Sequence, residues 1–364
     1  MWRDESKLRT TPGLPTELHP VRNWLLGMFF LIFAMTIVGG ITRLTESGLS
    51  IVDWNLIMGT IPPLSDADWV TEFEKYQTSP QYQQVNHSMT VDQFKRIYVW
   101  EYVHRLLGRL IGVAFFVPWL FFVMRGRIRG RLAWKTFLAF VLGGLQGVLG
   151  WYMVQSGLVD VPAVSHYRLA AHFGLAVLVA MWILWIVLHM GDDTGLIPRD
   201  QRPDGGRPLV KSAWAFVILL AVQLIYGAFM AGKDAGHMYA TFPDMNGEFF
   251  PTGAQSLPTW WDNLLDNPAM IHFMHRTLAY VVAVGAVLLW WRGLKNPISR
   301  AAKRLNLLMV FLVVVQIILG AITVMSHVSL HAAVTHQAVG FVMMAVAVAL
   351  VAALRRPVVD PNFS

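Results

Sequence analysis

Four histidines at matched positions are the residues of this chain best suited to chemistry. His104 and His275 each precede an arginine, in the segments EYVHR (101–105) and IHFMHR (271–276). His172 and His336 close the segments RLAAH (168–172) and AVTH (333–336). Each histidine lies near one end of a long apolar run. Ionisable groups inside a membrane span are costly, so each of these positions indicates a functional site.

Imidazole pairs of this kind are typical of porphyrin sites. Two neutral imidazoles from facing helices of a four-helix bundle can fill both axial positions of a haem iron. In each half of the chain only two helices supply a histidine at this depth, which predicts the pairs His104 with His172 and His275 with His336. A single such histidine is more often a packed, hydrogen-bonded core residue. Four in register favour two porphyrin sites.

His272 competes with His275 for the same role, because it lies one turn away on the same helix face. We prefer His275, since only this residue matches the His-Arg register of His104.

One carboxylate distinguishes the two predicted sites. Glu101 lies one turn before His104 and on the same helix face. The corresponding positions before the other three histidines have no carboxylate: Leu169, His272 and Ala333. This difference predicts that proton chemistry takes place in the first half of the chain. The alternative is a structural salt bridge from Glu101 to Arg105 or Arg168.

Four arginines near the same ends are natural partners for haem propionates, through bidentate charge-assisted bonds: Arg43, Arg105, Arg168 and Arg276. Ordinary anchoring at the membrane interface is the alternative for each of them.

The composition predicts a membrane protein that crosses the bilayer several times. Of the 364 residues, 55% are hydrophobic and only 14% are charged, whereas soluble domains carry about 25% charged residues. The net charge of +7 does not indicate nucleic-acid binding, because the Lys and Arg residues fall in loops beside apolar runs. Cysteine is absent. Disulfides, thiolate metal sites and covalently attached c-type haem are therefore excluded.

Eight runs are long enough to span a membrane, which takes about 20 mostly apolar residues. They lie at residues 24–42, 98–124, 134–155, 168–190, 212–231, 269–291, 305–326 and 332–354. The expected fold is all-α, with eight transmembrane helices arranged as two pseudo-symmetric four-helix bundles. The bilayer itself is therefore one expected partner.

The basic residues predict the orientation, since cytoplasmic loops are rich in Lys and Arg. Most of the 29 Lys and Arg residues lie in the two tails and in alternate loops, on one side of an eight-span chain. Residues 1–23 and 355–364 are thus expected to be cytoplasmic tails, with the histidines toward the outer side. The N-terminal tail lacks both a signal-peptide core and a transit-peptide pattern. This favours a bacterial inner membrane.

An internal repeat underlies this topology. A polar residue and a glycine recur four residues apart in alternate spans: Thr36 and Gly40, Gln146 and Gly150, Gln223 and Gly227, Gln316 and Gly320. The repeat predicts a first half at 24–190 and a second half at 212–354, joined by a cytoplasmic linker at 191–211 and related by an axis along the membrane normal. The glycines suit either tight helix packing or close approach of a flat macrocycle.

Two long outer loops, at 43–97 and 232–268, are rich in Gly, Pro and aromatic residues. Long ordered loops of this kind are typical of the lid or wall of a site.

The chain resembles the haem A synthase family over nearly its whole length. The segments that carry the resemblance are GGITRLTESGLSIVDW (39–54), GTIPP (59–63), EYVHRLLGRLIG (101–112), YRLAAHFGLA (167–176), DAGHMYATFPDMNGEFFP (234–251), NPAMIHFMHRTLAY (267–280) and HQAVGF (336–341). Since some bacterial members carry cysteine pairs in their outer loops, this chain is similar to the cysteine-free branch shared by alphaproteobacteria and mitochondria.

The resemblance implies an oxidoreductase that converts haem O to haem A for cytochrome oxidase. The porphyrin methyl group becomes a formyl group through a hydroxymethyl stage. His275 and His336 would ligate a resident haem b, and His104 and His172 would ligate the substrate haem, with Glu101 as the essential carboxylate. Expected partners are haem O synthase, cytochrome oxidase assembly factors and an electron acceptor, and a homo-oligomer is compatible with this reading.

Two other classes of membrane protein are alternatives. A diheme b-type electron-transfer protein would use the same four histidines but would not need Glu101 or large outer loops. A transporter would place its polar groups at the membrane midplane, whereas here they gather at the outer ends.

Overall fold

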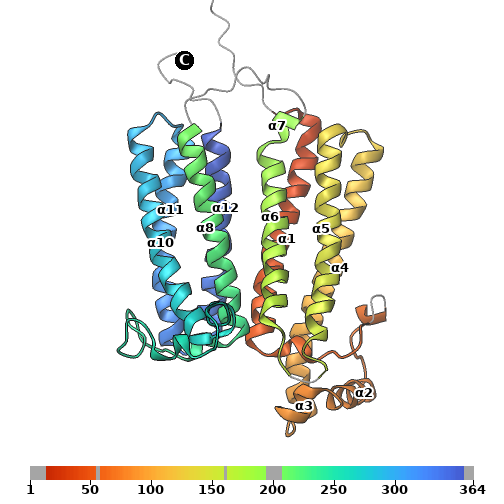
Figure 1. The fold of residues 1–364 in the computed structure, drawn as a ribbon. Helices are drawn as coiled ribbons and strands as arrows, with labels where there is room; N and C mark the ends of the chain where they lie inside the picture. Colours follow the sequence, from red (N-terminus) through yellow and green to blue (C-terminus); the bar gives the residue numbers. More distant parts are fainter. Residues whose placement is uncertain (1–13, 55–57, 160–161, 194–206, 356–364) are drawn as a thin grey trace, which may run out of the picture.

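The computed structural model describes residues 14–54, 58–159, 162–193 and 207–355 (Figure 1). Across these ranges the chain is helical, and eight helices are long and apolar enough to cross a membrane. They are α1 (His19–Leu44), α4 (Val91–Met124), α5 (Gly130–Gln155), α6 (His166–Leu188), α8 (Arg207–Gly232), α10 (Pro268–Lys295), α11 (Arg300–Met325) and α12 (Leu330–Leu354). The predicted all-α, eight-span fold is confirmed.

Several helices begin earlier than their apolar runs suggest. A short 3-10 helix, η1 (Thr16–Leu18), and the start of α1 fall within the expected tail at 1–23. Likewise α4 begins at Val91, because Thr90 and Gln93 form a capping box there. In the expected linker, α7 (Met190–Asp193) and the first turn of α8 are helical. The rest of that linker, at 194–206, and the tail segments 1–13 and 356–364 lie outside the described residues.

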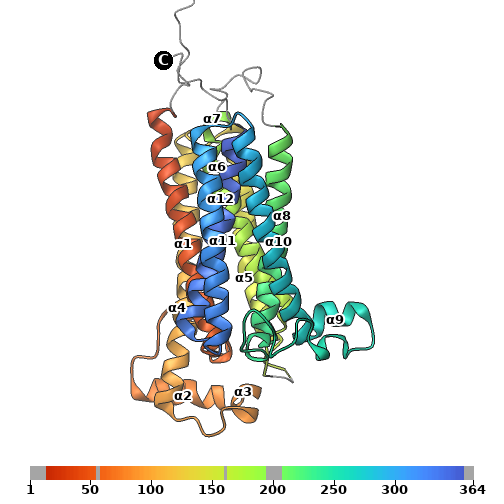
Figure 2. The ribbon, with the colours of Figure 1, turned by 90° about the vertical axis from the view of Figure 1, so that its left-hand side faces the viewer.

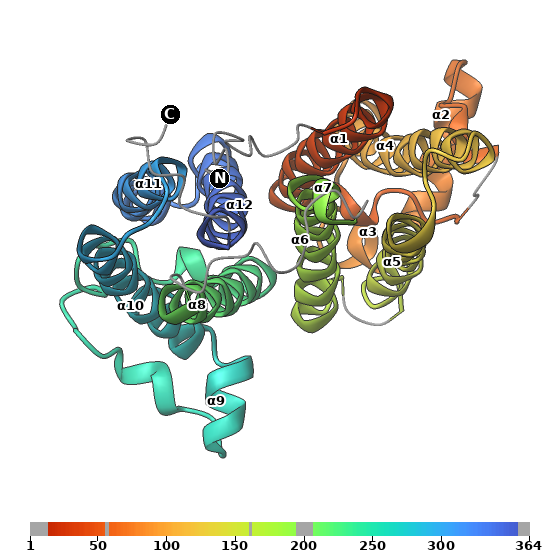
Figure 3. The ribbon, with the colours of Figure 1, turned by 90° about the horizontal axis from the view of Figure 1, so that it is seen from above.

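The eight helices form two groups of four, seen side by side in Figures 1 and 3. In one group α1 packs against α4 and α6, and α5 packs against α6. In the other, α10 packs against α8 and α11, and α12 packs against α8 and α11. The groups meet where α6 contacts α8 and α12, and where α1 contacts α12. This arrangement agrees with the two halves expected from the repeat.

A single apolar cluster runs through both halves. It includes Leu25 of α1, Ile183 of α6, Phe216 of α8, and Phe341 and Met344 of α12. The most apolar stretch of α12 is 61% buried, against 11% in α4 and α5. Hence α12 is central to the molecule, while α4 and α5 lie at its periphery. Van der Waals packing of this kind drives helix association in a bilayer.

The outer loop of the first half is a small domain of its own at one end of the bundle. It contains η2 (Ser47–Leu49), η3 (Met58–Thr60), α2 (Asp66–Gln77) and α3 (Pro80–Gln84). Helix α2 starts at a capping box formed by Ser65 and Asp68. An apolar cluster of Ile51 and four aromatic residues then holds α2 and the loop against the extended N-terminal part of α4: Ile51, Phe73, Tyr76, Phe94 and Tyr98. Figure 2 shows α2 and α3 standing beyond the ends of the membrane helices.

The outer loop of the second half lies closer to the bundle. It contains η6 (Ala235–His237), η7 (Thr252–Gln255) and α9 (Trp260–Asp266). Both loops open in the same way, with an acidic residue in the left-handed region (Glu46, φ 53°; Asp234, φ 51°) followed by a 3-10 helix. Left-handed backbone is uncommon for residues other than glycine. Its recurrence at corresponding positions therefore supports the repeat.

Candidate functional site

The four histidines lie on four different helices, all near the end that carries the large loops: His104 on α4, His172 on α6, His275 on α10 and His336 on α12. All four side chains are half-buried. Nδ1 of His104, His172 and His336 is shut off from solvent and has no hydrogen-bond partner. For these three rings the nitrogen that remains accessible is therefore Nε2.

Each imidazole packs against a glycine of a neighbouring helix. A Cβ built on the glycine would approach the histidine Cε1 to 3.0 Å at Gly39 (His104), 3.0 Å at Gly150 (His172), 3.3 Å at Gly227 (His275) and 3.1 Å at Gly320 (His336). Contacts this short are rare for real Cβ atoms, so glycine is what lets the rings sit here. The glycines thus pack against the imidazoles. The sequence had suggested helix packing or contact with a macrocycle, and neither of these is a contact with the histidine ring.

The shared glycine register slips by one residue in α1. There Gly39 contacts His104, while the expected Gly40 faces the side chain of Gln337, whose Oε1 lies 2.8 Å from a Cβ built at Gly40. At this position α1 also receives a side chain from the other half of the molecule, that of Gln337.

Glutamines hold three of the four histidine backbones. The side-chain amide donates a hydrogen bond to the histidine carbonyl from Gln146 to His172 (2.7 Å), from Gln223 to His275 (3.0 Å) and from Gln316 to His336 (2.8 Å). The fourth position is Thr36, whose hydroxyl bonds Phe33 within its own helix (2.7 Å). The Thr36 carbonyl instead accepts from Nε2 of Gln337 at 2.6 Å. A residue adjacent to His336 thereby joins α12 to α1.

The geometry fits an iron porphyrin between paired imidazoles. The ring centroids of His275 and His336 are 6.3 Å apart, with an interplanar angle of 73°. Metal–imidazole bonds are about 2 Å long, so two imidazoles on opposite faces of one iron place their centroids roughly 6 Å apart. Iron bound at the accessible Nε2 would leave Nδ1 as the protonated nitrogen of each ring.

His272 is already satisfied by the protein. It is fully buried, its Nδ1 donates to the Ala235 carbonyl (3.0 Å), and its Nε2 accepts from Nε of Arg276 (2.9 Å). With both ring nitrogens occupied, His272 has no lone pair available for iron. His275 therefore remains the candidate ligand of α10.

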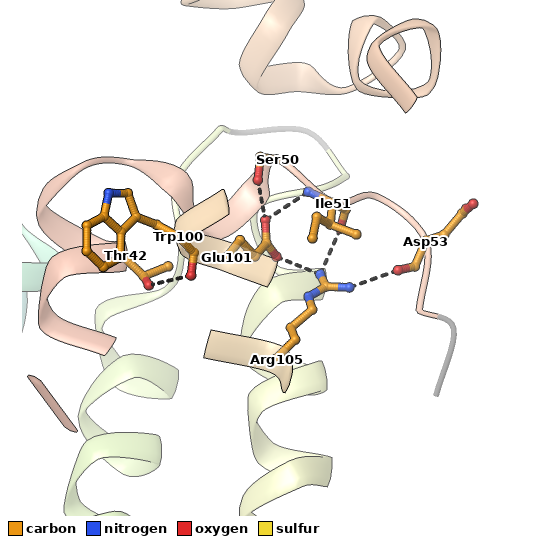
Figure 4. Close-up of polar contacts among 7 residues, drawn as sticks. All are labelled: Thr42, Ser50, Ile51, Asp53, Trp100, Glu101 and Arg105. Atoms are coloured by element: carbon orange, nitrogen blue, oxygen red, sulfur yellow. Dashed lines mark hydrogen bonds and ion pairs between the residues drawn. The ribbon is translucent and has the colours of Figure 1, made fainter. Parts of the chain in front are cut away.

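Glu101 is buried, with 2% of its surface exposed, and its carboxylate accepts hydrogen bonds on both oxygens (Figure 4). Oε2 accepts from the Ser50 hydroxyl (2.7 Å) and from the backbone N–H of Ile51 (2.8 Å). Oε1 forms an ion pair with Arg105 at 2.6 Å. The carboxylate thus fixes the start of the first-half loop above His104. Of the two salt bridges considered from the sequence, the one to Arg105 forms.

Arg105 and Arg276 occupy corresponding places and hold the two loops by their backbone carbonyls. Arg105 donates to Ile51 (2.7 Å) and Asp53 (2.8 Å). Arg276 donates to three carbonyls of the second-half loop: Tyr239 (3.4 Å), Thr241 (2.8 Å) and Asp244 (2.5 Å). The partner one turn before each arginine is Glu101 in the first half and His272 in the second. The two ends therefore share one architecture but differ in charge.

The other two predicted arginines also contact protein groups. Arg43 reaches across the halves to the Ala231 carbonyl (2.6 Å) and to Asp234 (2.8 Å). Arg168 donates to the Tyr152 carbonyl (2.7 Å), and its guanidinium lies over the Tyr152 ring. All four arginines thus have anchoring roles in the structure.

Charged residues outside the membrane spans reinforce the loops. Lys75 of α2 bridges Glu72 (2.7 Å) and Asp53 (3.1 Å), and hydrogen bonds to these two carboxylates raise its pKa. In the second-half loop, hydrogen bonds from the Thr241 hydroxyl and the Gly247 N–H lower the pKa of Asp244. Both loops are therefore ordered walls rather than loose connections.

Sequence reasoning missed Gly39, Ser50 and Gln337 as parts of this region. Gly39 is adjacent to Gly40 of the sequence repeat, and Gln337 is adjacent to the candidate ligand His336. These neighbours were the available signals for the two residues. Ser50 carried none, because its partner Glu101 lies 51 residues away.

Gly150→Ala is expected to weaken porphyrin binding in the first half. The added methyl group would meet the His172 ring, and overpacking of this kind costs about 1–3 kcal/mol. We therefore expect the affinity for ferric porphyrin, followed by optical titration of the purified protein, to fall roughly tenfold or more. Gly147→Ala on the same helix is the control, because nothing lies within 4 Å of a Cβ at that position. Equal affinities in both variants would contradict this role of Gly150.

Comparison with known proteins assigns the chain to a family. The family model described as "Cytochrome oxidase assembly protein" (COX15-CtaA) matches residues 22–348. A protein of Nitrosospira multiformis named "Heme A synthase" is 42% identical over 93% of this chain and 94% of its own length. Proteins with the same name from Parvibaculum lavamentivorans (42% identical, 91% of this chain and 93% of the relative) and Brucella ovis (40%, 90% of each) are similar as well. The chain therefore belongs to the COX15-CtaA family of cytochrome oxidase assembly proteins.

Proposed function

We propose that this chain is a haem A synthase, which oxidises the methyl group of haem O to a formyl group through a hydroxymethyl intermediate. Its family and the names of its curated relatives support this activity. One structural observation carries it further. Two sites of the same architecture each hold a pair of half-buried histidines, and only one of them contains a buried carboxylate, that of Glu101.

In this proposal the two halves of the chain bind different haems. The first half, residues 24–190, receives haem O between His104 and His172. The second half, residues 212–354, holds a resident haem b between His275 and His336, whose ring separation fits two axial ligands. A b-type haem in that place supplies a one-electron redox couple. The direct contacts between α6 and α8 and between α1 and α12 keep the two sites at a fixed spacing.

Glu101 acts in the first half as a proton acceptor or as a stabiliser of positive charge. Loss of two electrons to the electron acceptor and of one C–H proton from the substrate methyl group would leave a cationic carbon. Water adds to this carbon, and the proton that the added water loses passes toward the carboxylate. A second round gives a gem-diol that loses water to form the aldehyde. Glu101 suits this role because a positioned carboxylate stabilises developing positive charge best where water is excluded, and Ser50, Ile51 and Arg105 hold it in place.

The alternative is a diheme b-type electron-transfer protein. It would need the four histidines and the glycines against which they pack. It would not need a buried carboxylate in one half only, nor two outer loops fastened to α4 and α10 by arginines. The asymmetry therefore favours the synthase.

The same proposal includes the location of the protein in the cell and its partners. The protein lies in a bacterial inner membrane with both termini in the cytoplasm and both porphyrin sites toward the outer side, where Lys and Arg are sparse. Haem O synthase supplies the substrate, and cytochrome oxidase assembly factors and an electron acceptor are the further partners.

Reporter fusions test this orientation. A fusion at Ile128, in the loop between α4 and α5, should report cytoplasm, and fusions at Lys75 and Phe250 should report the outer side. The loop between α4 and α5 lies at the opposite end of the helices from the two large loops (Figure 1). A cytoplasmic signal at Phe250 would overturn the predicted orientation.

Glu101→Gln tests the catalytic proposal. In a host that lacks its own haem A synthase but makes haem O, the wild-type chain should yield haem A. The variant keeps the size of the side chain but removes its charge and its ability to accept a proton. Loss of a positioned proton acceptor typically costs about a hundredfold in rate. Chromatography of total extracted haem should therefore show haem O or the hydroxymethyl compound accumulating while haem b stays bound to the protein.

Ser50→Ala is the matched control. It removes one hydrogen bond to the carboxylate and leaves the charge in place. If Glu101 served only to fasten the loop, both variants would lose haem A and stability together. Normal haem A yield with Gln at position 101 would exclude the catalytic role.

A further inference from the structure

The second-half outer loop presents large aromatic side chains to its surroundings. Phe249 is 83% exposed, Trp260 62% and Trp261 64%, and Phe250 is partly exposed as well. These four residues are called the α9 surface below. Such a concentration of exposed aromatic side chains on a single loop is unusual for a surface that faces only water.

The α9 surface lies beside the membrane helices rather than beyond them. Figure 2 shows α9 at the level where the membrane helices end, whereas α2 and α3 of the other loop stand further out. Seen along the helices, α9 lies outside the bundle, beside α8 and α10 (Figure 3). Any surface there projects over the lipid that surrounds the second half.

The α9 surface is continuous with a lipid-facing flank of α10. The rings of Phe249 and Phe250 meet that of Phe273, near the start of α10, at centroid distances of 6.3 Å and 5.0 Å. Further along the same helix, several large side chains are exposed on the outside of the bundle: Tyr280, Val281, Val284 and Leu288. These residues lie in a membrane span, so their surroundings are acyl chains.

The opposite side of α9 is fixed to the protein. Asn263 is buried and donates to the carbonyls of Leu257 (2.9 Å) and Thr259 (2.7 Å), while its Oδ1 accepts from Asn267 (3.0 Å). Asp266 accepts from Tyr167 (2.5 Å) and pairs with Lys233 (3.2 Å). The fold therefore holds Trp260 and Trp261 outward in a set orientation, and they do not collapse onto the helices.

We propose that the α9 surface is an interfacial anchor that lies in the headgroup region of the outer leaflet, with phospholipid as its partner. Trp is enriched at this depth because its ring is apolar and its N–H remains hydrated. The charged residues of α9 are acidic, Asp262 and Asp266. Attachment therefore rests on apolar contact rather than on attraction to anionic lipid.

The anchor has a consequence for the histidine site of the second half. The same loop carries the Tyr239, Thr241 and Asp244 carbonyls held by Arg276. The loop is thus fastened at one point to α10, which bears His275, and at another to the bilayer. Its position over the site then depends on the membrane.

A single-cysteine labelling experiment tests the proposal, because the natural chain has no cysteine. Trp261→Cys, labelled with an environment-sensitive fluorophore and reconstituted in phosphatidylcholine vesicles, should emit at shorter wavelength. Lipid spin-labelled near its headgroup should quench it several-fold more than the control. The control is Val85→Cys, an exposed apolar residue next to α3 in the loop that stands away from the membrane. Phe249→Cys provides a second site if the first variant does not accumulate.

Each outcome of the labelling experiment either supports the anchor or overturns it. Quenching at position 261 or 249 well above that at 85 supports the anchor. Equal, weak quenching with emission typical of water shows that the surface faces solvent, and overturns it. A shift to shorter wavelength without quenching by lipid shows that protein covers the surface, such as a second copy of the chain, and overturns it as well.

Discussion

The contact between an imidazole and a glycine of the next helix is the constraint on which the rest of the structure depends. It occurs four times, and each time a Cβ on the glycine would crowd Cε1 of the ring. Nδ1 of three of these rings is buried without a partner, so the nitrogen that remains accessible on each of the three is Nε2. Glutamines fix the histidine backbones of α6, α10 and α12 at the same level. A flat, metal-bearing ligand is the partner that such a set of rings suits.

The outer ends complete this scheme. Arg105 and Arg276 bind loop carbonyls and thereby close each bundle beyond its histidines. Each arginine also pairs with a side chain one turn earlier on its helix, which is a carboxylate in the first half and an imidazole in the second. A duplicated scaffold with a different side chain at this position can keep two similar ligands in different electrostatic surroundings. That is what a substrate site beside a cofactor site requires.

Much of this was predictable from the sequence because the constraints were strong. A bilayer needs long apolar helices, so the eight spans and their pairing into halves could be read directly. The histidines stood out because polar residues are rare in such runs. The sequence could not predict which residues would be brought together by tertiary contacts. Gln337 bonds Thr36 of the other half, and in α1 the glycine that packs against the histidine is Gly39 rather than Gly40. Tertiary contacts also separate His272 from His275, because Ala235 and Arg276 occupy both ring nitrogens of His272.

The central claim is that the four imidazoles form two porphyrin sites, of which the one in the second half holds a resident haem b. Pyridine haemochrome spectra of purified protein test it most directly. The wild-type chain should contain haem b with traces of O-type or A-type haem. His336→Ala should lose haem b, and His172→Ala should retain it. Haem b that survives in His336→Ala and disappears in His172→Ala would reverse the two sites, and a wild-type protein without haem would contradict the account.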